Sequence, residues 1–347
     1  MVSGSKFISI IMPCRQEEKY IARALTSILA NDYPRDRQEV LVVDGMSTDG
    51  TRDIIAGFAQ DYPFIKLLDN PRKITPAALN IGISQARGDI IVRVDAHSTY
   101  PPDYFSSLVD WQEKTGADNV GGVWRIVPGN DTPMARAIAV GFAHPFGVGN
   151  AHYRIGASTP RWVDTVPFGC YRREVFARHG LFDEDHVRTE DDEFNLRLRQ
   201  NGGRSLLVPD IVIDYYARES LPKVWRMYYY YGYFKALVAK KLGLVLSLRH
   251  LIPSLLVLTL AGSLLLSWLF PVLGVLGFLV LLVYLLADVI FAWRAGREHG
   301  LAVTACLFLV FPTLHFSYGL GFLKGFWDFI ILGKTGRKGS KAVPLAR

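Results

Sequence analysis

No charged side chain occurs between Leu251 and Ala287, and this gap limits what the chain can fold into more than any other feature. The gap spans about 37 residues. One helix of that length would measure roughly 55 Å, whereas the hydrocarbon core of a bilayer is about 30 Å thick. Pro253 and Pro271 suit two helices joined by a tight turn near Phe270, so we predict a membrane hairpin over residues 251–292. A buried hairpin of a soluble protein is the alternative, but soluble helices keep one polar face and these segments have none.

A third apolar stretch, residues 301–323, is interrupted by Pro312, His315 and several glycines, so it could span the bilayer or re-enter it. Basic residues flank the apolar segments before, between and after them: Lys240, Lys241, Arg249, Arg294, Arg297, Lys324, Lys334, Arg337, Lys338 and Lys341. Basic flanks prefer the cytoplasm, and a third full crossing would place the basic tail outside. We therefore expect a re-entrant or interfacial third segment in a multi-pass protein of the cytoplasmic membrane, with its amino-terminal domain in the cytoplasm.

The net charge of +7 is accounted for by these basic flanks, which suit anionic lipid headgroups, so it does not predict nucleic-acid binding. The amino terminus has an apolar run of only about eight residues followed by a cluster of charges, which is not the pattern of a signal peptide. Cys14, Cys170 and Cys306 are few and scattered, which indicates reduced thiols in a cytosolic compartment.

The first 230 residues alternate apolar strands with amphipathic helices. The expected strands cover residues 7–13, 39–44, 65–69 and 90–95, and a helical pattern follows each of them. Continuous apolar strands of this kind predict a parallel sheet covered by helices on both faces. Such sheets bind ligands at the carboxyl ends of their strands. Four polar features fall at that edge: residues 13–17, Asp44, Asp69 and residues 95–97.

Asp95 ends an apolar strand, and a carboxylate in that position must be solvated, paired or bound to a metal. A dinucleotide is the obvious ligand for such a sheet, but the first strand is followed by Pro-Cys-Arg-Gln-Glu-Glu rather than by a glycine-rich turn. The sequence therefore argues against a nicotinamide-dependent oxidoreductase.

Taken together, the motifs over residues 6–235 resemble those of the family-2 glycosyltransferases, which have the GT-A fold and use nucleotide sugars. The matching motifs, in chain order, are Pro13-x-Arg15-x-Glu17, the VVDGMSTDGT segment at 42–51, PAALNIGISQARGD at 76–89, Asp95-Ala96-His97 and TEDDEF at 189–194. Within the family, the chain resembles the exopolysaccharide branch typified by the succinoglycan glucosyltransferase. The resemblance implies an α/β catalytic domain at 1–235, with a Rossmann-like mixed sheet, followed by a helical membrane region at 236–347.

The resemblance also implies which residues bind the donor. Asp95 would hold the donor diphosphate through a divalent metal, and the nucleoside would contact an earlier set of residues: Pro13, Arg15, Glu17, Asp44 and Lys73. Asp44 would accept a hydrogen bond from the base, with uracil and therefore UDP expected. A surface lysine is the alternative interpretation of Lys73.

Two departures from the family pattern change the expectations. His97 replaces the second carboxylate of Asp-x-Asp, and imidazole suits Mn²⁺ better than Mg²⁺, so we expect Mn²⁺ or Mg²⁺ held by Asp95 and His97. A solvated loop histidine is the alternative for His97. The Gln-x-x-Arg-Trp motif of processive members is absent from the sequence, and the segment at 223–241 stands in its place. We therefore expect one sugar to be transferred per encounter.

The TEDDEF segment supplies the candidate general base. Acids in the first turn of a helix favour its dipole, and Thr189 can cap the helix, so a purely structural role is the alternative. Four adjacent acids exceed what capping needs, and their mutual repulsion raises a carboxyl pKa, as a base requires. With the family pattern added, Asp191 is the candidate base, and direct displacement would invert the anomeric centre.

The candidate acceptor residues are Glu190, Arg172 and Tyr231, the last in a tyrosine-rich segment that would lie at the headgroup level of the membrane. Surface or anchoring roles are the alternatives for Arg172 and Tyr231. We expect inverting, non-processive transfer from a nucleotide sugar to a polyprenyl-diphosphate-linked sugar. Transfer to bare polyprenyl phosphate and a non-catalytic membrane scaffold with a degenerate sugar-nucleotide domain are the rival functions.

Overall fold

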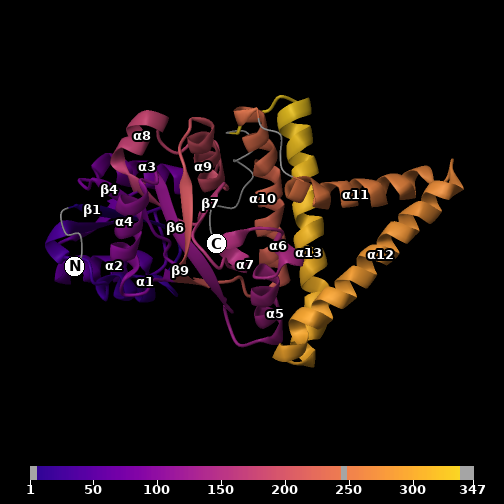
Figure 1. Cartoon of the computed structure of the whole chain (residues 1–347), viewed down its shortest axis with the longest axis horizontal. Coiled ribbons are helices and arrows are strands. Elements are labelled where there is room, and N and C mark those ends of the chain that lie inside the picture. Colours follow the sequence, from indigo (N-terminus) through magenta and orange to yellow (C-terminus); the bar gives the residue numbers. More distant parts are fainter. Residues whose placement is uncertain (1–5, 244–247, 337–347) are drawn as a thin grey trace. The chain divides into compact units, whose positions relative to one another are not determined.

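The computed structural model describes residues 6–243 and 248–336, and the chain forms two compact units (Figure 1). Of the described residues, the first unit comprises 6–125 and 156–215, and the second comprises 126–155, 216–243 and 248–336. The segment at 126–155 thus belongs to the same compact unit as the carboxyl-terminal helices, although it precedes much of the first unit in the sequence.

The first unit is built on a mixed, nine-stranded sheet in the order β3-β2-β1-β4-β8-β6-β9-β5, with β7 beside β9. Four strands are parallel neighbours, as the apolar runs predict: β1 (Ile8–Cys14), β2 (Gln38–Asp44), β3 (Ile65–Asp69) and β4 (Ile90–Arg93). The others are β5 (Ser98–Thr99), β6 (Asn119–Val127), β7 (Arg161–Val163), β8 (Cys170–Arg172) and β9 (Ser205–Tyr216). Because β8 runs antiparallel to both β4 and β6, the sheet is mixed, as the GT-A resemblance implies.

Helices cover both faces of this sheet (Figure 1). The helices of the first unit are α1 (Ile21–Leu29), α2 (Thr51–Asp61), α3 (Thr75–Gln85), α4 (Tyr104–Thr115), α8 (Arg173–His179) and α9 (Glu190–Gln200). Leu41 and Val43 of β2 pack with α3, α8 and α9 in one apolar core. Their neighbours Val40 and Val42 are equally buried and point to the opposite face, because side chains alternate along a strand.

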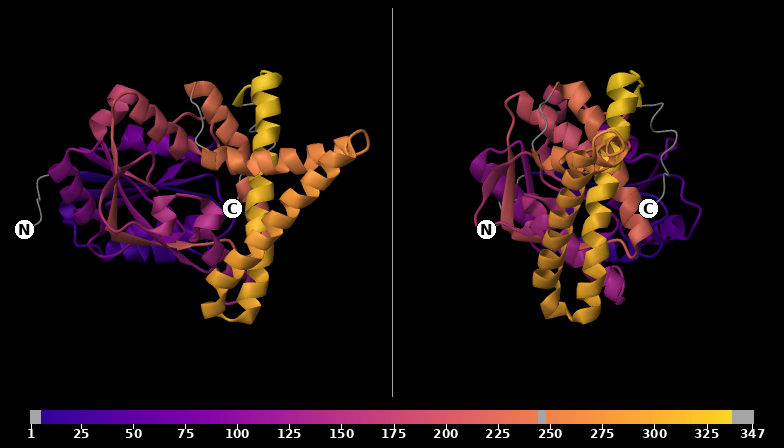
Figure 2. Two further views of the ribbon diagram at one scale, coloured as in Figure 1. Left: turned by 45° about the vertical axis from the view of Figure 1, so that its right-hand side comes forward. Right: turned by 90° about the vertical axis from the view of Figure 1, so that its right-hand side faces the viewer.

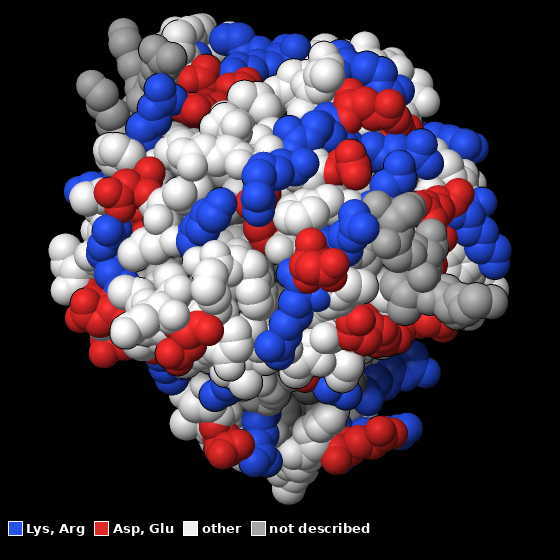
Figure 3. Space-filling view, turned by 90° about the vertical axis from the view of Figure 1, so that its left-hand side faces the viewer, with Lys and Arg blue, Asp and Glu red and all other residues white. Residues whose placement is uncertain are grey.

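Basic and acidic side chains are interspersed on the face of the molecule that Figure 3 presents. Several of them form close pairs within the first unit, such as Arg178 with Asp118 at 2.8 Å and Arg197 with Glu193 at 2.7 Å. Arg197 also donates to the backbone carbonyl of Leu181, so it fixes α9 to the preceding loop.

The second unit is helical, and its core joins α5, α10, α12 and α13. Its helices are α5 (Pro133–Phe142), α6 (Pro145–Val148), α7 (His152–Ile155), α10 (Leu221–Leu242), α11 (Leu248–Leu266), α12 (Pro271–Gly296) and α13 (Leu301–Gly325). A π-helical turn, Phe326–Ile331, continues α13. Figures 1 and 2 show α12 and α13 meeting at the turn that joins them and diverging away from it.

The apolar segments form continuous helices. The turn between α11 and α12 falls at residues 267–270, where the sequence predicts it. α13 runs unbroken through Pro312, which favours the spanning alternative over a re-entrant one. Among the described residues, Pro271–His299 and Leu301–Ile331 are long and apolar enough to cross a membrane, whereas the apolar part of α11, His250–Leu266, is shorter. A hairpin of α11 and α12 therefore stays a prediction, and α13 joins α12 as a candidate span.

Candidate active site

The register of the sheet brings the predicted polar features to one edge. Cys14 pairs with Asp44, and Asp44 pairs with Asp69, so the carboxyl ends of β1, β2 and β3 are level. β4 lies on the other side of β1, and the amide of Val94 donates to the carbonyl of Ile11. The sequence prediction that these strand ends share one edge is confirmed by this geometry.

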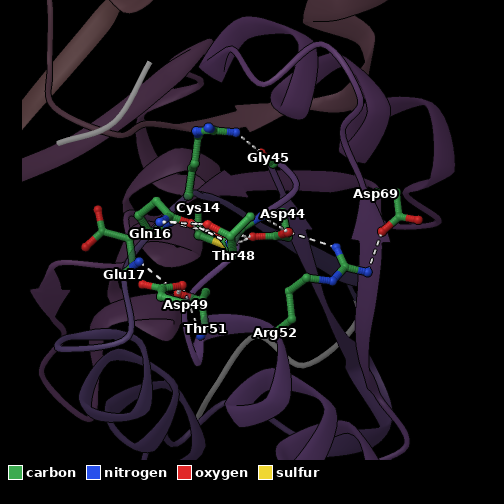
Figure 4. Close-up of polar contacts among 12 residues, drawn as sticks. Cys14, Gln16, Glu17, Asp44, Gly45, Thr48, Asp49, Thr51, Arg52 and Asp69 are labelled. Atoms are coloured by element: carbon green, nitrogen blue, oxygen red, sulfur yellow. Dashed lines mark hydrogen bonds and ion pairs between the residues drawn. The ribbon is translucent and has the colours of Figure 1, made fainter. Parts of the chain in front are cut away.

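The turns that follow β1 and β2 are locked together by hydrogen bonds (Figure 4). The backbone amide of Gln16 donates to Ser47 Oγ at 2.9 Å, and the Gln16 side-chain oxygen accepts from the amide of Thr48 at 2.7 Å. The amide of Glu17 donates to Thr51 Oγ1 at 2.9 Å, and Arg15 donates to the carbonyl of Gly45. The turn after β1 is therefore fixed by three residues that also shape the turn after β2: Ser47, Thr48 and Thr51.

Asp44 is fully buried and already accepts several hydrogen bonds. Its Oδ2 accepts from the amide of Ser47 at 2.9 Å and from Arg52 at 2.8 Å, while its Oδ1 accepts from the Ser47 hydroxyl. Arg52 also reaches Asp69 at 2.8 Å, as Figure 4 shows. These partners and the complete burial of its side chain favour Asp44 as the organiser of this turn.

Asp95 and His97 lie beyond β4 and are both partly exposed, with 17% and 16% of their side chains accessible. The nearest oxygen of Asp95 is 4.0 Å from His97 Nε2, and His97 Nδ1 lies 3.3 Å from Glu17 Oε1. Tyr100 fixes the backbone of Asp95, because its hydroxyl accepts from the Asp95 amide at 2.7 Å. Glu17 thus orients the imidazole ring, and Nε2 is the nitrogen on the Asp95 side.

This donor set fits a divalent cation in part. Within the described residues, no group of three or more His, Cys, Asp or Glu side chains is arranged to hold a metal. Asp95 and His97 supply two ligands of the kind Mn²⁺ accepts, and a carboxylate on the second ring nitrogen is the usual outer-shell partner of a metal-binding histidine. The residues therefore suit an ion whose remaining ligands come from a bound diphosphate.

The acidic segment opens α9. Thr189 precedes it with φ +68°, an uncommon left-handed conformation for a β-branched residue, and its side chain makes no capping bond. Glu190 is buried, while Asp191 is partly exposed. Asn195, one turn further along, is fully buried; it accepts from Asn119 at 2.7 Å and donates to Thr165 at 3.0 Å.

Arg93 was not predicted from the sequence, yet it connects the two halves of the site. Its Nη2 lies 3.0 Å from Glu190 and 3.5 Å from Asp95, and 8% of its side chain is exposed. Burial disfavours its charged form, but Asp95, Glu190 and Asp191 outweigh that cost and raise the pKa of Arg93. A charge inside an otherwise apolar strand was the available signal, since a buried arginine is almost always paired.

Burial also raises the pKa of Glu190 from its usual 4.5 to about 7, helped by the negative charges of Asp191 and Asp95 and opposed by Arg93. Glu190 therefore exchanges a proton near neutral pH, next to a partly exposed Asp191. This arrangement places a buried carboxyl group, which is paired with Arg93 and titrates near neutral pH, beside a second carboxyl group that is partly exposed.

Three further predicted site residues belong to other elements. Arg172 pairs with Ile90 at the start of β4, at the opposite end of that strand from Asp95, and donates to the carbonyl of Gln112. Lys73 is exposed in the loop after β3, with φ +63°. Tyr231 belongs to the second unit, where its ring lies 5.6 Å from that of Tyr228. Arg172 therefore lies away from Asp95, whereas the roles of Lys73 and Tyr231 stay predictions.

The mixed sheet order and the carboxylates at its edge agree with the GT-A fold that the sequence resemblance implies. A family model described as Glycosyl transferase family 2 matches residues 9–180. The succinoglycan biosynthesis protein ExoA of Rhizobium meliloti is 32% identical over 246 residues, which cover 70% of this chain and 73% of that protein. The chain therefore belongs to glycosyl transferase family 2 and is a glycosyltransferase.

Other relatives match more of the chain. A dolichyl N-acetyl-α-D-glucosaminyl phosphate 3-β-D-2,3-diacetamido-2,3-dideoxy-β-D-glucuronosyltransferase of Methanococcus voltae is 28% identical over 336 residues, covering 92% of this chain and 98% of that protein. Among solved structures, the mannosyltransferase PcManGT from Pyrobaculum calidifontis, in complex with GDP-Man and Mn²⁺, has a TM-score of 0.59 and 21% identity. That alignment covers 94% of this chain and 88% of the mannosyltransferase, and it shows a shared fold.

Proposed function

We propose that this glycosyltransferase transfers one sugar per encounter, with inversion, from a nucleotide sugar to a polyprenyl-diphosphate-linked sugar at the cytoplasmic face of the membrane. The observation that carries the proposal is the convergence of Asp95 and Glu190 on one amino group of Arg93. This contact places the candidate donor-binding edge beside the first turn of α9, where Asp191 is partly exposed.

The donor side of the proposal rests on the edge of the sheet. Asp95 and His97 would hold a divalent ion, which neutralises the charge of the diphosphate leaving group when it is bound. Glu17 keeps the His97 ring in place, and Asp44 with Arg52 keeps the neighbouring turn rigid. We propose UDP as the nucleotide, on the family resemblance, with Mn²⁺ at least as effective as Mg²⁺.

The acceptor side rests on α9. Asp191 would take the proton of the acceptor hydroxyl as that oxygen attacks the anomeric carbon from the face opposite the leaving group. Glu190 would remain buried and paired with Arg93, and its charge would influence Asp191. One direct displacement inverts the anomeric centre, so an α-linked donor gives a β-linked product.

The acceptor class is supported by two further observations. The name of the Methanococcus voltae relative gives a dolichyl-linked sugar phosphate as the molecule it acts on, which supports a lipid-linked sugar as the acceptor class. The second unit also contains two helices long and apolar enough to cross a membrane, which would hold the enzyme where such lipids lie.

A reconstitution experiment tests the proposal. The full chain in lipid nanodiscs is incubated with Mn²⁺, a panel of UDP- and GDP-sugars, and either sugar-loaded polyprenyl diphosphate or bare polyprenyl phosphate, and the glycolipids are analysed by mass spectrometry. We expect one added sugar on the sugar-loaded lipid and loss of product in excess chelator. Product only on bare polyprenyl phosphate would establish the same-fold rival, and no product with any donor would favour the scaffold.

A further inference from the structure

Arg93 is a charged residue in the middle of the sheet, and stability alone does not account for its surroundings. Its Nη2 is shared between Glu190 and Asp95, whereas Nε and Nη1 are buried without a hydrogen-bond partner among the described residues. Native proteins satisfy nearly all buried polar groups, so two unpaired donors on one guanidinium call for an explanation. A buried ion pair is also weak evidence for stability, because desolvation offsets most of its attraction.

The two carboxylates that Arg93 contacts come from distant parts of the chain. Asp95 lies two residues beyond Arg93, just past the end of β4, while Glu190 is the first residue of α9. α9 is held independently at its middle by Asn195 and at its far end by Arg197. Arg93 is therefore placed to set the position of the first turn of α9 relative to Asp95.

We propose that Arg93 is a positioning residue of the transfer reaction: by sharing one amino group between Asp95 and Glu190, it fixes the separation between the donor-binding carboxylate and the first turn of α9. This inference rests on the proposed function, in which Asp95 binds the donor and Asp191 is the base. Arg93 touches neither substrate in this arrangement and acts through its two partners.

The alternative is that Arg93 only neutralises the buried Glu190. The double variant Arg93→Met/Glu190→Gln separates the two roles, because it removes the buried charge pair together and leaves Asp95 without its guanidinium partner. The single variant Arg93→Met leaves Glu190 buried without its cationic partner and is expected to lower the unfolding temperature. The double variant should recover most of that loss.

The experiment uses the full chain in detergent, with Glu190→Gln as the reference for the double variant. Unfolding temperature, affinity for UDP and GDP in the presence of Mn²⁺, and turnover with the donor found by the panel are measured on each variant. Arg173→Met is a matched control, because Arg173, the first residue of α8, donates to the backbone carbonyls of Gly88 and Ala86. We expect the control to lower the unfolding temperature and to leave nucleotide affinity and turnover per folded molecule unchanged.

If Arg93 positions Asp95, the double variant folds but binds Mn²⁺-nucleotide and turns over roughly 10–100-fold less well than Glu190→Gln, the usual effect of losing an outer-shell partner. Turnover and nucleotide affinity equal to those of Glu190→Gln would overturn the inference and leave the proposed function standing. If the wild-type chain binds nucleotide but transfers no sugar, the proposed function fails, and the affinity comparison still decides the role of Arg93. A wild-type chain that neither binds nucleotide nor transfers sugar would overturn both.

Discussion

Asp191 is the residue on which the proposed chemistry depends most directly. Asp191→Asn keeps the shape of the side chain but cannot accept the acceptor proton, so we expect turnover to fall by roughly 10²–10⁴. Nucleotide affinity should be nearly unchanged, because no nucleotide contact is assigned to Asp191. Asp95→Asn provides the contrast, since it should weaken Mn²⁺ and nucleotide binding together with turnover.

Near-normal turnover of Asp191→Asn would mean that Asp191 stabilises the start of α9 and is not the general base, since asparagine is tolerated at the start of a helix. The base would then be sought among Glu190 and Asp192. Turnover and nucleotide affinity measured on the same preparation of each variant decide between these outcomes.

Glu190 gives the protein a pH dependence of known sign. The folded protein holds its proton up to a pKa of about 7, whereas the unfolded chain loses it near 4.5. A group whose pKa is raised by folding contributes stability that is full below the unfolded pKa and is lost as the pH rises through the folded one. We therefore expect the stability of the wild type to decline, relative to that of Glu190→Gln, between pH 4.5 and 7.

The measurement is the difference in unfolding temperature between the two proteins at pH 4.5, 5.5, 6.5 and 7.5. Taking the difference removes the contributions of the other carboxylates, which both proteins share. Parallel profiles for the two proteins would show that burial does not raise the pKa of Glu190.

Single residues differ in how well the sequence predicts them. The position of Asp44 and Asp95 at one edge was predictable, because each ends an apolar run and the ends of parallel strands meet at one edge. Arg172 was placed wrongly near the site, because β8 runs antiparallel to β4 and carries Arg172 toward the other end. Arg93 was missed because its role depends on pairing with Glu190, which lies almost a hundred residues further along the chain. The charge inside an apolar run marks Arg93 as a paired residue, but no local pattern identifies a partner at such a distance.

At the scale of elements, the first four strands and their helices were predictable, because apolar runs alternate with helical periodicity. Two of the later strands, β7 and β8, were not, since each has three residues, too few to show any period. Whether these strands run parallel or antiparallel to their neighbours depends on the path of the chain and not on composition. The mixed character of the sheet therefore came from the family resemblance alone.

The packing of α10 against α13 depends on glycines that sequence periodicity does not reveal. A Cβ atom at Gly321 would lie 1.9 Å from the carbonyl oxygen of Tyr229, and one at Gly232 would lie 2.1 Å from that of Tyr318. These are contacts with backbone, which cannot move aside as a side chain can. The two helices approach this closely only because both positions lack a side chain.

We expect Gly321→Ala to destabilise the second unit by about 1–3 kcal/mol, the usual cost of overpacking a tight contact. Gly262→Ala is the matched control, since a Cβ at Gly262 in α11 meets no atom within 4 Å. The unfolding temperature of both variants in detergent tests this, and equal values would show that α10 and α13 are not in close contact.

At the scale of the whole molecule, the chain divides into a catalytic unit and a helical unit that are interleaved in sequence. The segment at 126–155 belongs with the helices: His315 of α13 bonds the carbonyl of Phe146 at 2.7 Å, and the Phe146 ring stacks on Phe291 at 4.6 Å. Composition could not predict this, because the segment is no more apolar than the sheet that precedes it. The apolar carboxyl-terminal helices were predictable from charge alone.

The last prediction concerns the sides of the membrane. Arg294 and Arg297 lie at the end of α12, and basic flanks prefer the cytoplasm, so we expect residue 298 on the same side as the catalytic unit and residue 268 on the other. Glu298→Cys, Trp268→Cys and Asp36→Cys report these positions, in a Cys306→Ser background where Cys14 and Cys170 are buried. Each variant is labelled with an impermeant maleimide, before and after the membrane is opened.

Residues 298 and 36 labelled from one side, with residue 268 labelled from the other, would establish α11 and α12 as a spanning hairpin. Residue 298 labelled from the side opposite to residue 36 would instead make α12 and α13 the two crossings, with α11 at the cytoplasmic surface. Those two helices are the longer apolar pair, and that arrangement also returns the basic tail to the cytoplasm. The charge of the 294–299 turn and the length of α11 thus favour different topologies, and the label on residue 298 decides between them.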